Sequence, residues 1–298
     1  MRSVSFYSDG EVIYGHLYMP ERTSPRNGFP AVVLCNGFAA VKEMLVPRFA
    51  EGFSQNGYAV LTFDYRGFGE SDGKPRIIWS NQVRDVRSAV TFMQSVDGVN
   101  PDSIALWGTA LGGANAVMAA ARDRRVKCVV VQVTFGDGER VLFRGKGDDE
   151  IFRLRTSIEQ FWMKEVLTGQ TLYMGMNRFF NDEASKAFFD ANVDRYDALK
   201  VKLPFATFRE LMSLKPEHHI PEVSQPILIV AAENDSVNPK TESERLFARA
   251  GGPRSLFVIP GVDHFDIYQG DAFGQAFSEE LRWFGRYLTE PSAGGVSI

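Results

Sequence analysis

The sequence predicts an α/β fold, with a mostly parallel sheet of about eight strands and helices on both faces of the sheet. Several short runs of β-branched residues are apolar on both faces, which is typical of central parallel strands. Segments with helical spacing of their apolar residues separate these runs along the chain. Because alternating strands and helices fold into a parallel sheet covered on both faces, these two observations predict the fold class.

The predicted elements follow in order from the N-terminus. The stretch MRSVSFYSDGEVIYGHLYMP predicts two strands around a turn at Asp9 and Gly10. Buried strands are then predicted at PAVVLCNG, YAVLTFDYRG, SIALWG, VKCVVVQVTF, PILIVAAEND and RSLFVIPG. Helical faces are predicted in two places, at Val83, Val86, Val90 and Met93 and at Phe273, Phe277, Leu281 and Phe284.

The alternation of strands and helices breaks between residues 135 and 221. A structureless loop of that length would be unusual in a compact domain, and a helical stripe runs through Ile151, Leu154 and Ile158. We therefore expect residues 135–221 to form an inserted helical cap on a core of residues 1–134 and 222–290. A frayed tail is expected at 291–298. The alternative is a peripheral helical elaboration with no contact to any functional site.

The composition excludes several classes of protein. The chain has 298 residues, a formal net charge of −4 and no long basic run, so nucleic-acid binding has no electrostatic signature here. No stretch of about 18 apolar residues occurs, and the N-terminus lacks the apolar core of a signal peptide, so no membrane span is expected. The cysteines are Cys35 and Cys128, without metal-type spacing, which favours a cytoplasmic setting and no metal site.

A sharp turn is predicted where the strand SIALWG meets the next helix. The sequence there is GTALGG, with Ala110 at its centre. Glycines two positions before and after the centre relieve crowding in a turn that pushes the central side chain up at the carboxyl end of the sheet. The helix N-terminus beneath the turn favours developing negative charge. This is the nucleophile-elbow pattern G-x-S-x-G, with alanine in place of the serine.

Two further motifs lie where a catalytic acid and base are required, in the order nucleophile, acid, histidine. Asp235 follows the strand PILIVAA, and His264 follows the last strand, RSLFVI. Of the four histidines, only His264 fits this order. Glu233 and Asp263 are rivals for the acid. Glu233 lies nearer the strand and Asp263 adjoins the histidine, so Asp235 is the favoured residue.

An oxyanion hole needs two backbone N–H groups aimed at the developing charge. One is expected from Leu111, which follows the nucleophile position, and the other from the loop after the strand AVVLC. In that loop Gly37 permits a close turn, and Phe38 offers the N–H group. The alternative is a plain turn between a strand and a helix.

Together these motifs resemble the α/β-hydrolase superfamily over residues 29–288. The resemblance is carried by DYRGFGESDG at 64–73, the GTALGG elbow, the strand end at Asp235 and the motif GVDHFD. The chain looks most similar to bacterial esterase-like members near the dienelactone hydrolases and the X-prolyl dipeptidyl peptidase catalytic domain. The resemblance implies that Arg66 shapes the loop beside the site. Two residues depart from the family pattern, with Asn36 in place of a frequent histidine and Ala110 in place of serine.

Ala110 allows two interpretations. In the one we favour, serine is the native residue and this chain is an engineered, inactive variant, because a base, an orienting acid and oxyanion donors serve one purpose together. In the other, Ala110 is native and the pocket binds a ligand without turnover, as a sensor or scaffold would. A serine codon at this position in the source gene would decide for the first.

With serine in place of Ala110, we expect hydrolysis of a carboxylic ester or lactone, with no cofactor. The aromatic residues of 135–221 favour a medium-sized, partly aromatic small-molecule acyl substrate. Its candidate contacts are Gly37, Trp79, Phe161 and Trp162. Amide, thioester or β-diketone C–C hydrolysis and acyl transfer use the same triad and stay open, and so does a homodimer.

Overall fold

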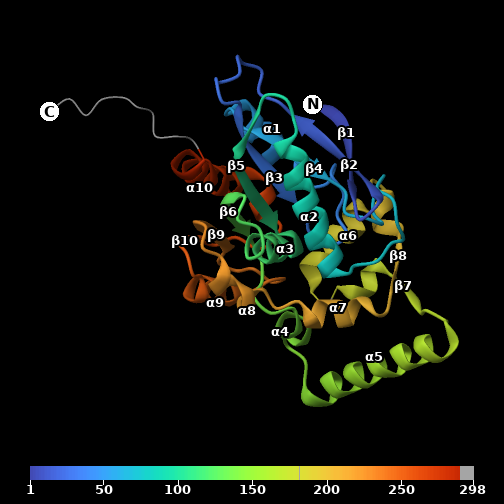
Figure 1. Ribbon diagram of the computed structural model, residues 1–298. Helices are drawn as coiled ribbons and strands as arrows, with labels where there is room; N and C mark the ends of the chain where they lie inside the picture. The colour runs from blue at the N-terminus through green and yellow to red at the C-terminus, as the bar shows by residue number, and fades with distance from the viewer. Residues whose placement is uncertain (181, 289–298) are drawn as a thin grey trace.

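An eight-stranded sheet forms the centre of the molecule (Figure 1). The computed structural model of the chain describes residues 1–180 and 182–288. The strands of this sheet are β1 (Arg2–Ser8), β2 (Glu11–Tyr18), β3 (Phe29–Cys35), β4 (Ala59–Phe63), β5 (Val99–Thr109), β6 (Val126–Gln132), β9 (Ile227–Ala232) and β10 (Arg254–Ile259). Their order across the sheet is β1-β2-β4-β3-β5-β6-β9-β10.

The sheet is parallel except at its N-terminal edge. β1 pairs antiparallel with β2, and β2 with β4, whereas every pair from β4 to β10 is parallel. The β1–β2 hairpin turns at Asp9 and Gly10, whose φ angles are 49° and 87°. Positive φ at both central residues is what a type I′ hairpin turn requires. The prediction of an α/β fold with about eight strands and an antiparallel start is confirmed.

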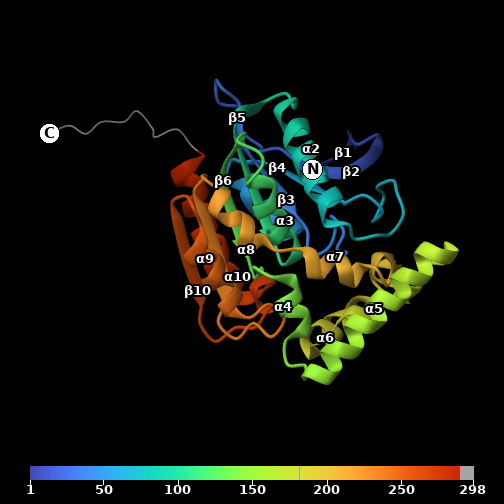
Figure 2. The same cartoon turned by 60° about the horizontal axis from the view of Figure 1, so that its bottom comes forward.

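Helices cover both faces of the sheet and bury two apolar layers (Figure 2). One face carries α2 (Trp79–Gln94), α3 (Leu111–Ala120) and α9 (Lys240–Arg249), and the other carries α1 (Pro47–Gln55) and α10 (Gly270–Tyr287). The expected apolar face of α2 is buried, and Phe284 of α10 is fully buried. Within the described residues, no helix is long and apolar enough to cross a membrane.

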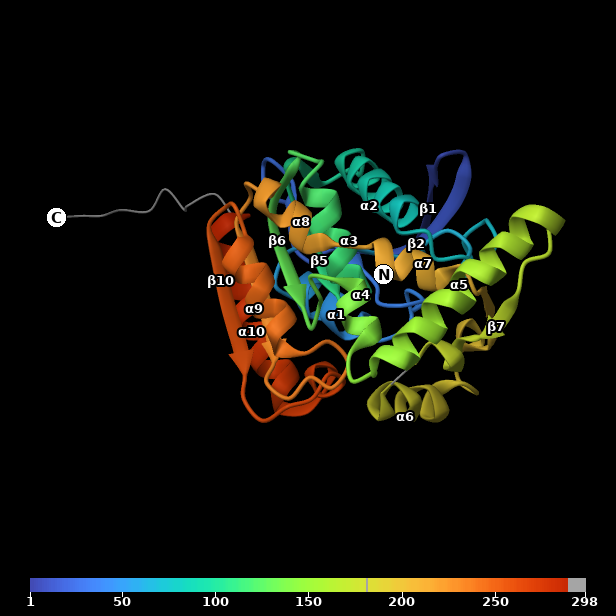
Figure 3. The same ribbon diagram turned by 90° about the horizontal axis from the view of Figure 1, so that it is seen from below.

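Between β6 and β9 the chain forms a separate set of elements, which are short except for α5. They are α4 (Gly138–Phe143), α5 (Asp148–Thr168), β7 (Tyr173–Gly175), η1 (Met176–Phe179), α6 (Glu183–Asn192), η2 (Asp197–Lys200), β8 (Lys202–Pro204), α7 (Thr207–Ser213), α8 (Pro216–His219) and η3 (Ile220–Glu222). The helices α4 to α7 gather on the side of the sheet toward which the β5 arrow points, and α5 lies outermost (Figures 1 and 3). These elements span residues 138–222, where we expected a cap at 135–221, and the division into core and cap stays a prediction. The expected tail at 291–298 lies outside the described residues.

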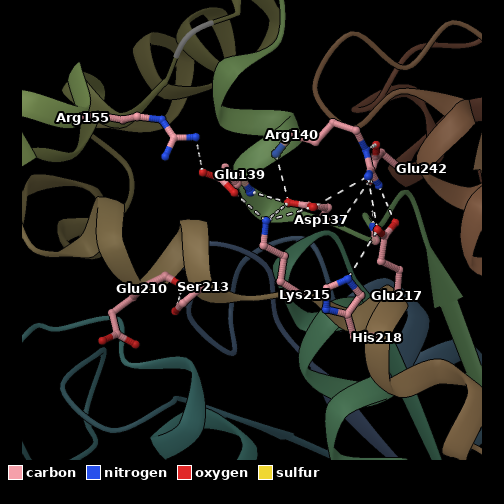
Figure 4. A network of polar contacts seen from close by, with 11 residues as sticks. Asp137, Glu139, Arg140, Arg155, Glu210, Ser213, Lys215, Glu217, His218 and Glu242 are labelled. Atoms are coloured by element: carbon pink, nitrogen blue, oxygen red, sulfur yellow. Dashed lines mark hydrogen bonds and ion pairs between the residues drawn. The ribbon is translucent and has the colours of Figure 1, made fainter. Parts of the chain in front are cut away.

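A network of ion pairs fastens the start of this segment to α8 and α9 (Figure 4). Arg140 of α4 donates to Glu217 of α8 at 2.6 Å and to Glu242 of α9 at 2.8 Å. The side chain of Glu242 is 3% exposed, and it also accepts the backbone N–H of Asp137 at 3.1 Å. Lys215 pairs with Asp137 at 2.7 Å. These ion pairs therefore hold the start of the segment after β6 against two helices, α8 and α9, that follow much later in the sequence.

We expect Arg140→Met to lower the free energy of unfolding at pH 7 by about 3 kcal/mol, because the buried Glu242 carboxylate loses its cation. The Arg140 side chain is 33% exposed, which places the effect at the lower end of the range for buried pairs. Urea titration measures the difference between the variant and the parent chain.

The same difference should depend on pH. The Arg140 guanidinium holds the pKa of Glu217 below its ordinary value. This stabilisation is complete above the unfolded-state pKa of about 4.3 and is lost as the pH falls through the folded-state pKa. A penalty for Arg140→Met that stays constant from neutral pH to below about pH 4 would contradict the ion-pair account.

Candidate active site

Ala110 occupies a sharp turn between β5 and α3. Its backbone has φ 50° and ψ −120°, a conformation that costs a residue other than glycine on the order of 1–3 kcal/mol. A Cβ atom on Gly108 would collide with the carbonyl of Gly112, and one on Gly112 would collide with the carbonyl of Cys35. The turn therefore requires glycine at both positions. Ala110 lines a pocket at this end of the sheet.

His264 and Asp235 meet at the carboxyl ends of β10 and β9. The two oxygens of the Asp235 carboxylate lie 3.0 and 2.9 Å from Nδ1 of His264, and both residues are buried. Oδ1 of Asp235 also accepts the backbone N–H groups of Val237 at 2.9 Å and Asn238 at 2.6 Å, which fix the carboxylate. A carboxylate on Nδ1 selects the tautomer with its proton there and leaves Nε2 free to accept a proton.

The two rival carboxylates are engaged elsewhere. Glu233 accepts the N–H of Gly261 at 2.8 Å. Asp263 accepts the N–H groups of Ser236 and His264, both at 2.7 Å. Burial opposes ionisation of Asp263, but these hydrogen bonds prevail and lower its pKa. Asp263 therefore ties two loops together as an ionised group, and Asp235 is the carboxylate that contacts the imidazole ring.

The loop after β3 lies against the Ala110 turn. A Cβ atom on Gly37 would lie 3.7 Å from the methyl carbon of Ala110, so the two backbones are close. Leu111 is the first residue of α3, and its N–H has no acceptor within the helix. Among the residues that the structure describes, no group accepts a hydrogen bond from the N–H of Phe38 or Leu111. Both groups can therefore donate to a ligand, beside the positive end of the α3 dipole.

These groups border one pocket of about 230 Å³, which Ala110, Leu111, Gly37, Phe38 and His264 line. Much of its remaining wall comes from the segment between β6 and β9, including Phe135, Val141, Leu142, Phe179, Phe180 and Phe188. In the described part of the chain, no group of three or more His, Cys, Asp or Glu side chains is placed to hold a metal ion. The pocket wall is predominantly apolar, with polar side chains at the strand ends and also at Arg144, Asp182 and Ser185 of the segment between β6 and β9.

Aromatic rings connect this segment to the histidine and to the loop after β3. Phe265 meets the His264 ring at a centroid distance of 4.9 Å, and Phe188 of α6 stacks on Phe265 at 4.5 Å. Phe38 contacts Phe179 at 6.0 Å between ring centroids. The segment between β6 and β9 thus packs directly against two loops that border the pocket.

Three of the expected substrate contacts do not line the pocket. Trp79 donates its indole N–H to a serine hydroxyl of α7 at 3.0 Å. Phe161 packs on Phe205 at a centroid distance of 4.8 Å, and an arginine of α7 lies 3.9 Å from the ring centroid of Trp162. The expected place of these residues in the pocket wall is therefore corrected. The helix α5 directs Phe161 and Trp162 toward the region of β8 and α7, and Trp79 of α2 bonds to α7. Gly37, the fourth, does line the pocket.

Two residues that the sequence analysis did not single out lie next to the site. Tyr268 lines the pocket, and its hydroxyl hydrogen-bonds to Thr109, which precedes Ala110. Burial raises the pKa of Tyr268, so its hydroxyl stays protonated. Asn238 also lines the pocket and donates its side-chain N–H to the carbonyl of Val133 at 2.8 Å. In the sequence, Asn238 lies three residues after Asp235 and Tyr268 four residues after His264. This closeness to the expected acid and base was the signal that could have identified them.

The proteins that this chain resembles in sequence and structure share its α/β fold. The family model described as serine aminopeptidase S33 (Hydrolase_4) matches residues 29–267. The chain belongs to this family. It is a member of the α/β-hydrolase superfamily, as the motifs predicted. The match spans the Ala110 turn, Asp235 and His264, and it includes the whole segment between β6 and β9.

Several proteins are similar to this α/β hydrolase over nearly their whole length. A 31.7 kDa protein of Escherichia coli from the traX–finO intergenic region is 36% identical, over 87% of this chain and 91% of the relative. Thiohydrolase aneE of Aspergillus aculeatus is 30% identical, over 92% of this chain and 89% of the relative. The crystal structure of protein PA2218 from Pseudomonas aeruginosa superposes with a TM-score of 0.83 at 24% identity, covering 96% and 93% of the two chains, and shows the shared fold.

Proposed function

We propose that this α/β hydrolase is built to cleave a carboxylic ester or lactone through a serine–Asp235–His264 triad, and that Ala110 makes the present chain inactive. The observation that carries the proposal is the Asp235–His264 contact of 2.9 Å beside the pocket that the strained Ala110 turn also lines. A buried carboxylate and a strained turn both cost stability. A site that only held an apolar ligand would need neither of them.

The proposed mechanism follows from the positions of these groups. With serine in place of Ala110, its hydroxyl oxygen attacks the substrate carbonyl carbon while Nε2 of His264 accepts the proton. Asp235 orients the imidazole and stabilises the imidazolium. The N–H groups of Phe38 and Leu111 bind the oxyanion of the tetrahedral intermediate. His264 then protonates the leaving alcohol, and a water activated by the same histidine releases the acid and restores the serine.

The lining of the pocket supports a medium-sized, partly aromatic substrate. Phe179, Phe180 and Phe188 offer aromatic surface, and polar groups lie both at the strand ends and on the segment between β6 and β9. In the proposed pose the carbonyl carbon lies near the Ala110 methyl group, with its oxygen toward the Phe38 and Leu111 N–H groups. The rest of the acyl group extends along the wall formed by the segment between β6 and β9, which acts as a cap in this proposal.

Thioester hydrolysis is the second candidate. It is favoured by the 30% identity to thiohydrolase aneE over most of both chains. Hydrolysis of thioesters, amides and β-diketones begins with nucleophilic attack on a carbonyl carbon, and so does acyl transfer. All of these reactions would use the same oxyanion hole. They differ in the leaving group or in the final acceptor, so the triad itself does not rank them.

The test is to assay the Ala110→Ser chain on a matched set of acyl compounds. The set consists of phenyl butyrate, S-phenyl thiobutyrate, butyranilide, a phenyl-substituted γ-lactone and a phenyl-substituted β-diketone, with the parent alanine chain as control. We expect the ester or the lactone to give the highest kcat/KM. A preference for the thioester would favour the second candidate, and no turnover of any compound would favour a ligand-binding protein in which alanine is native.

Binding should survive in the alanine chain and should depend on Phe188. We expect Phe188→Ala to weaken the binding of phenyl butyrate by about 10- to 100-fold, because burying an aromatic ring contributes roughly 1.5–3 kcal/mol. Phe161→Ala is the matched control, since Phe161 lies outside the pocket lining, and its Kd should stay within about twofold. Isothermal titration calorimetry measures both. Equal losses of affinity in the two variants would mean that the substrate binds close to α5 and outside the pocket that Ala110 lines.

A further inference from the structure

A buried lysine ends the loop that carries the Phe38 N–H. Lys42 is 1% exposed, and its ammonium donates to Oδ2 of Asp64 at 2.8 Å and to Glu70 at 2.6 Å. Its backbone N–H donates to Oδ1 of Asp64 at 2.7 Å. Asp64 is fully buried directly after β4. One carboxylate therefore holds the end of this loop through both the backbone and the side chain of Lys42.

The same loop is anchored at its start and strained between the anchors. Asn36 donates its side-chain N–H to the carbonyl of Phe63, the residue before Asp64, at 3.2 Å. Ala39 has a φ of 50°, in the left-handed region that residues other than glycine seldom occupy. Phe38 directly precedes this strained residue. Such a conformation persists only where surrounding contacts impose it, and the two anchors are contacts of that kind.

Stability alone does not require charged groups at this position. Well-packed apolar side chains are often as stabilising as a buried ion pair, or more so. A pair with directed hydrogen bonds instead fixes the position of the backbone to which it is bonded. That matters at an oxyanion hole, where a displacement of about 1 Å lowers the rate on the order of a hundredfold.

We propose that Asp64 and Lys42 are positioning residues that hold the Phe38 N–H in the oxyanion geometry. This inference rests on the proposed function, because it concerns the transition state of that reaction. Neither side chain lines the pocket, so both act through the backbone of residues 37–42. Full negative charge on the substrate oxygen develops only in the transition state. Loss of the pair therefore lowers kcat and has little effect on KM.

The test compares two buried carboxylates in the Ala110→Ser chain. Asp123, in the turn after α3, is buried like Asp64 and pairs with Arg125 at 2.8 Å, but it does not contact the loop after β3. We expect Asp64→Asn and Lys42→Met each to lower kcat on phenyl butyrate by about 30- to 100-fold, with KM within about threefold. The matched control Asp123→Asn should leave kcat within about threefold, although it too removes the charge of a buried, ion-paired carboxylate.

The two variants change the local charge in opposite directions. By Coulomb's law, removing the negative charge of Asp64 would stabilise a developing oxyanion, and removing the positive charge of Lys42 would destabilise it. A charge effect alone would therefore move kcat in opposite directions, whereas loss of positioning lowers kcat in both variants. Opposite shifts would overturn the inference, and so would an equal loss of kcat in Asp123→Asn.

A binding measurement in the alanine chain separates this inference from the proposed function. The carboxylate of 4-phenylbutyrate can place an oxygen at the oxyanion position, and its methyl ester is a neutral reference. We expect Asp64→Asn and Lys42→Met to weaken carboxylate binding relative to the ester by about tenfold each. If this pattern holds while Ala110→Ser is inactive on every acyl compound, the proposed function fails and the positioning role stands. Unchanged carboxylate binding in both variants would overturn the positioning role.

Discussion

Ala110→Ser is expected to convert a chain with negligible acyl hydrolysis into one with a kcat on phenyl butyrate at least about 10⁴-fold higher. In a serine protease, loss of the nucleophile costs on the order of 10⁶ in kcat, and the remaining rate comes from the oxyanion hole and binding. The substitution adds one oxygen to a side chain whose backbone already has φ 50° and ψ −120°, so no loop has to rearrange. Continuous measurement of phenol release gives the rates of both chains.

The gain should depend on the histidine. In the Ala110→Ser background, His264→Ala removes the proton acceptor and should abolish most of the new activity. Some residual rate is expected, since the oxyanion donors stay in place. Full activity without His264 would mean that another group activates the hydroxyl.

The second large effect is expected at the acid. In the Ala110→Ser chain, Asp235→Asn should lower kcat by on the order of 10⁴, because an amide at this position favours the wrong imidazole tautomer. Glu233→Gln is the matched control, since Glu233 directly follows the same strand but accepts a backbone N–H. The kcat of this variant should fall less than about threefold. Steady-state kinetics near pH 8 measure both. A similar loss in the two variants would mean that the acid has been misassigned.

The fold and the relative order of the three triad positions could be predicted because each depends on local pattern. Runs that are apolar on both faces predicted the parallel strands. The carboxyl ends of parallel strands meet at one edge of a sheet. Ala110, Asp235 and His264 each follow such a strand, and the contact between Asp235 and His264 is present at 2.9 Å in the structure. The roles of these residues in catalysis stay a prediction that the variants above test.

The pocket wall could not be predicted in the same way. Helical spacing shows which residues share a face, but it does not show which neighbour that face meets. Phe161 and Trp162 were expected at the substrate because their segment is rich in aromatic residues, and the structure turns them toward Phe205 and α7. Phe188 has the same sequence character, yet it stacks on the residue beside His264.

Ion pairs between distant parts of the chain were also beyond the sequence analysis. Arg140 meets Glu217 and Glu242 across 77 and 102 residues, and Lys42 meets Asp64 across 22. No periodicity links such partners, because each pair depends on tertiary packing that brings distant helices, strands and loops together. Asp64 is the first residue of the motif DYRGFGESDG. The motif alone did not indicate that the Asp64 carboxylate bonds to the loop after β3.

In the proposed mechanism, Ala110 stands where a nucleophile would face an activating histidine and two oxyanion donors. Intact mass spectrometry after treatment with an alkyl fluorophosphonate tests this most directly, because the reagent reacts with an activated serine hydroxyl. We predict that the Ala110→Ser chain gains one phosphonyl group on the peptide that contains position 110, while the alanine chain and the Ala110→Ser, His264→Ala double variant gain none. Absence of an adduct at position 110 in the Ala110→Ser chain, or equal labelling of all three chains, would contradict the account.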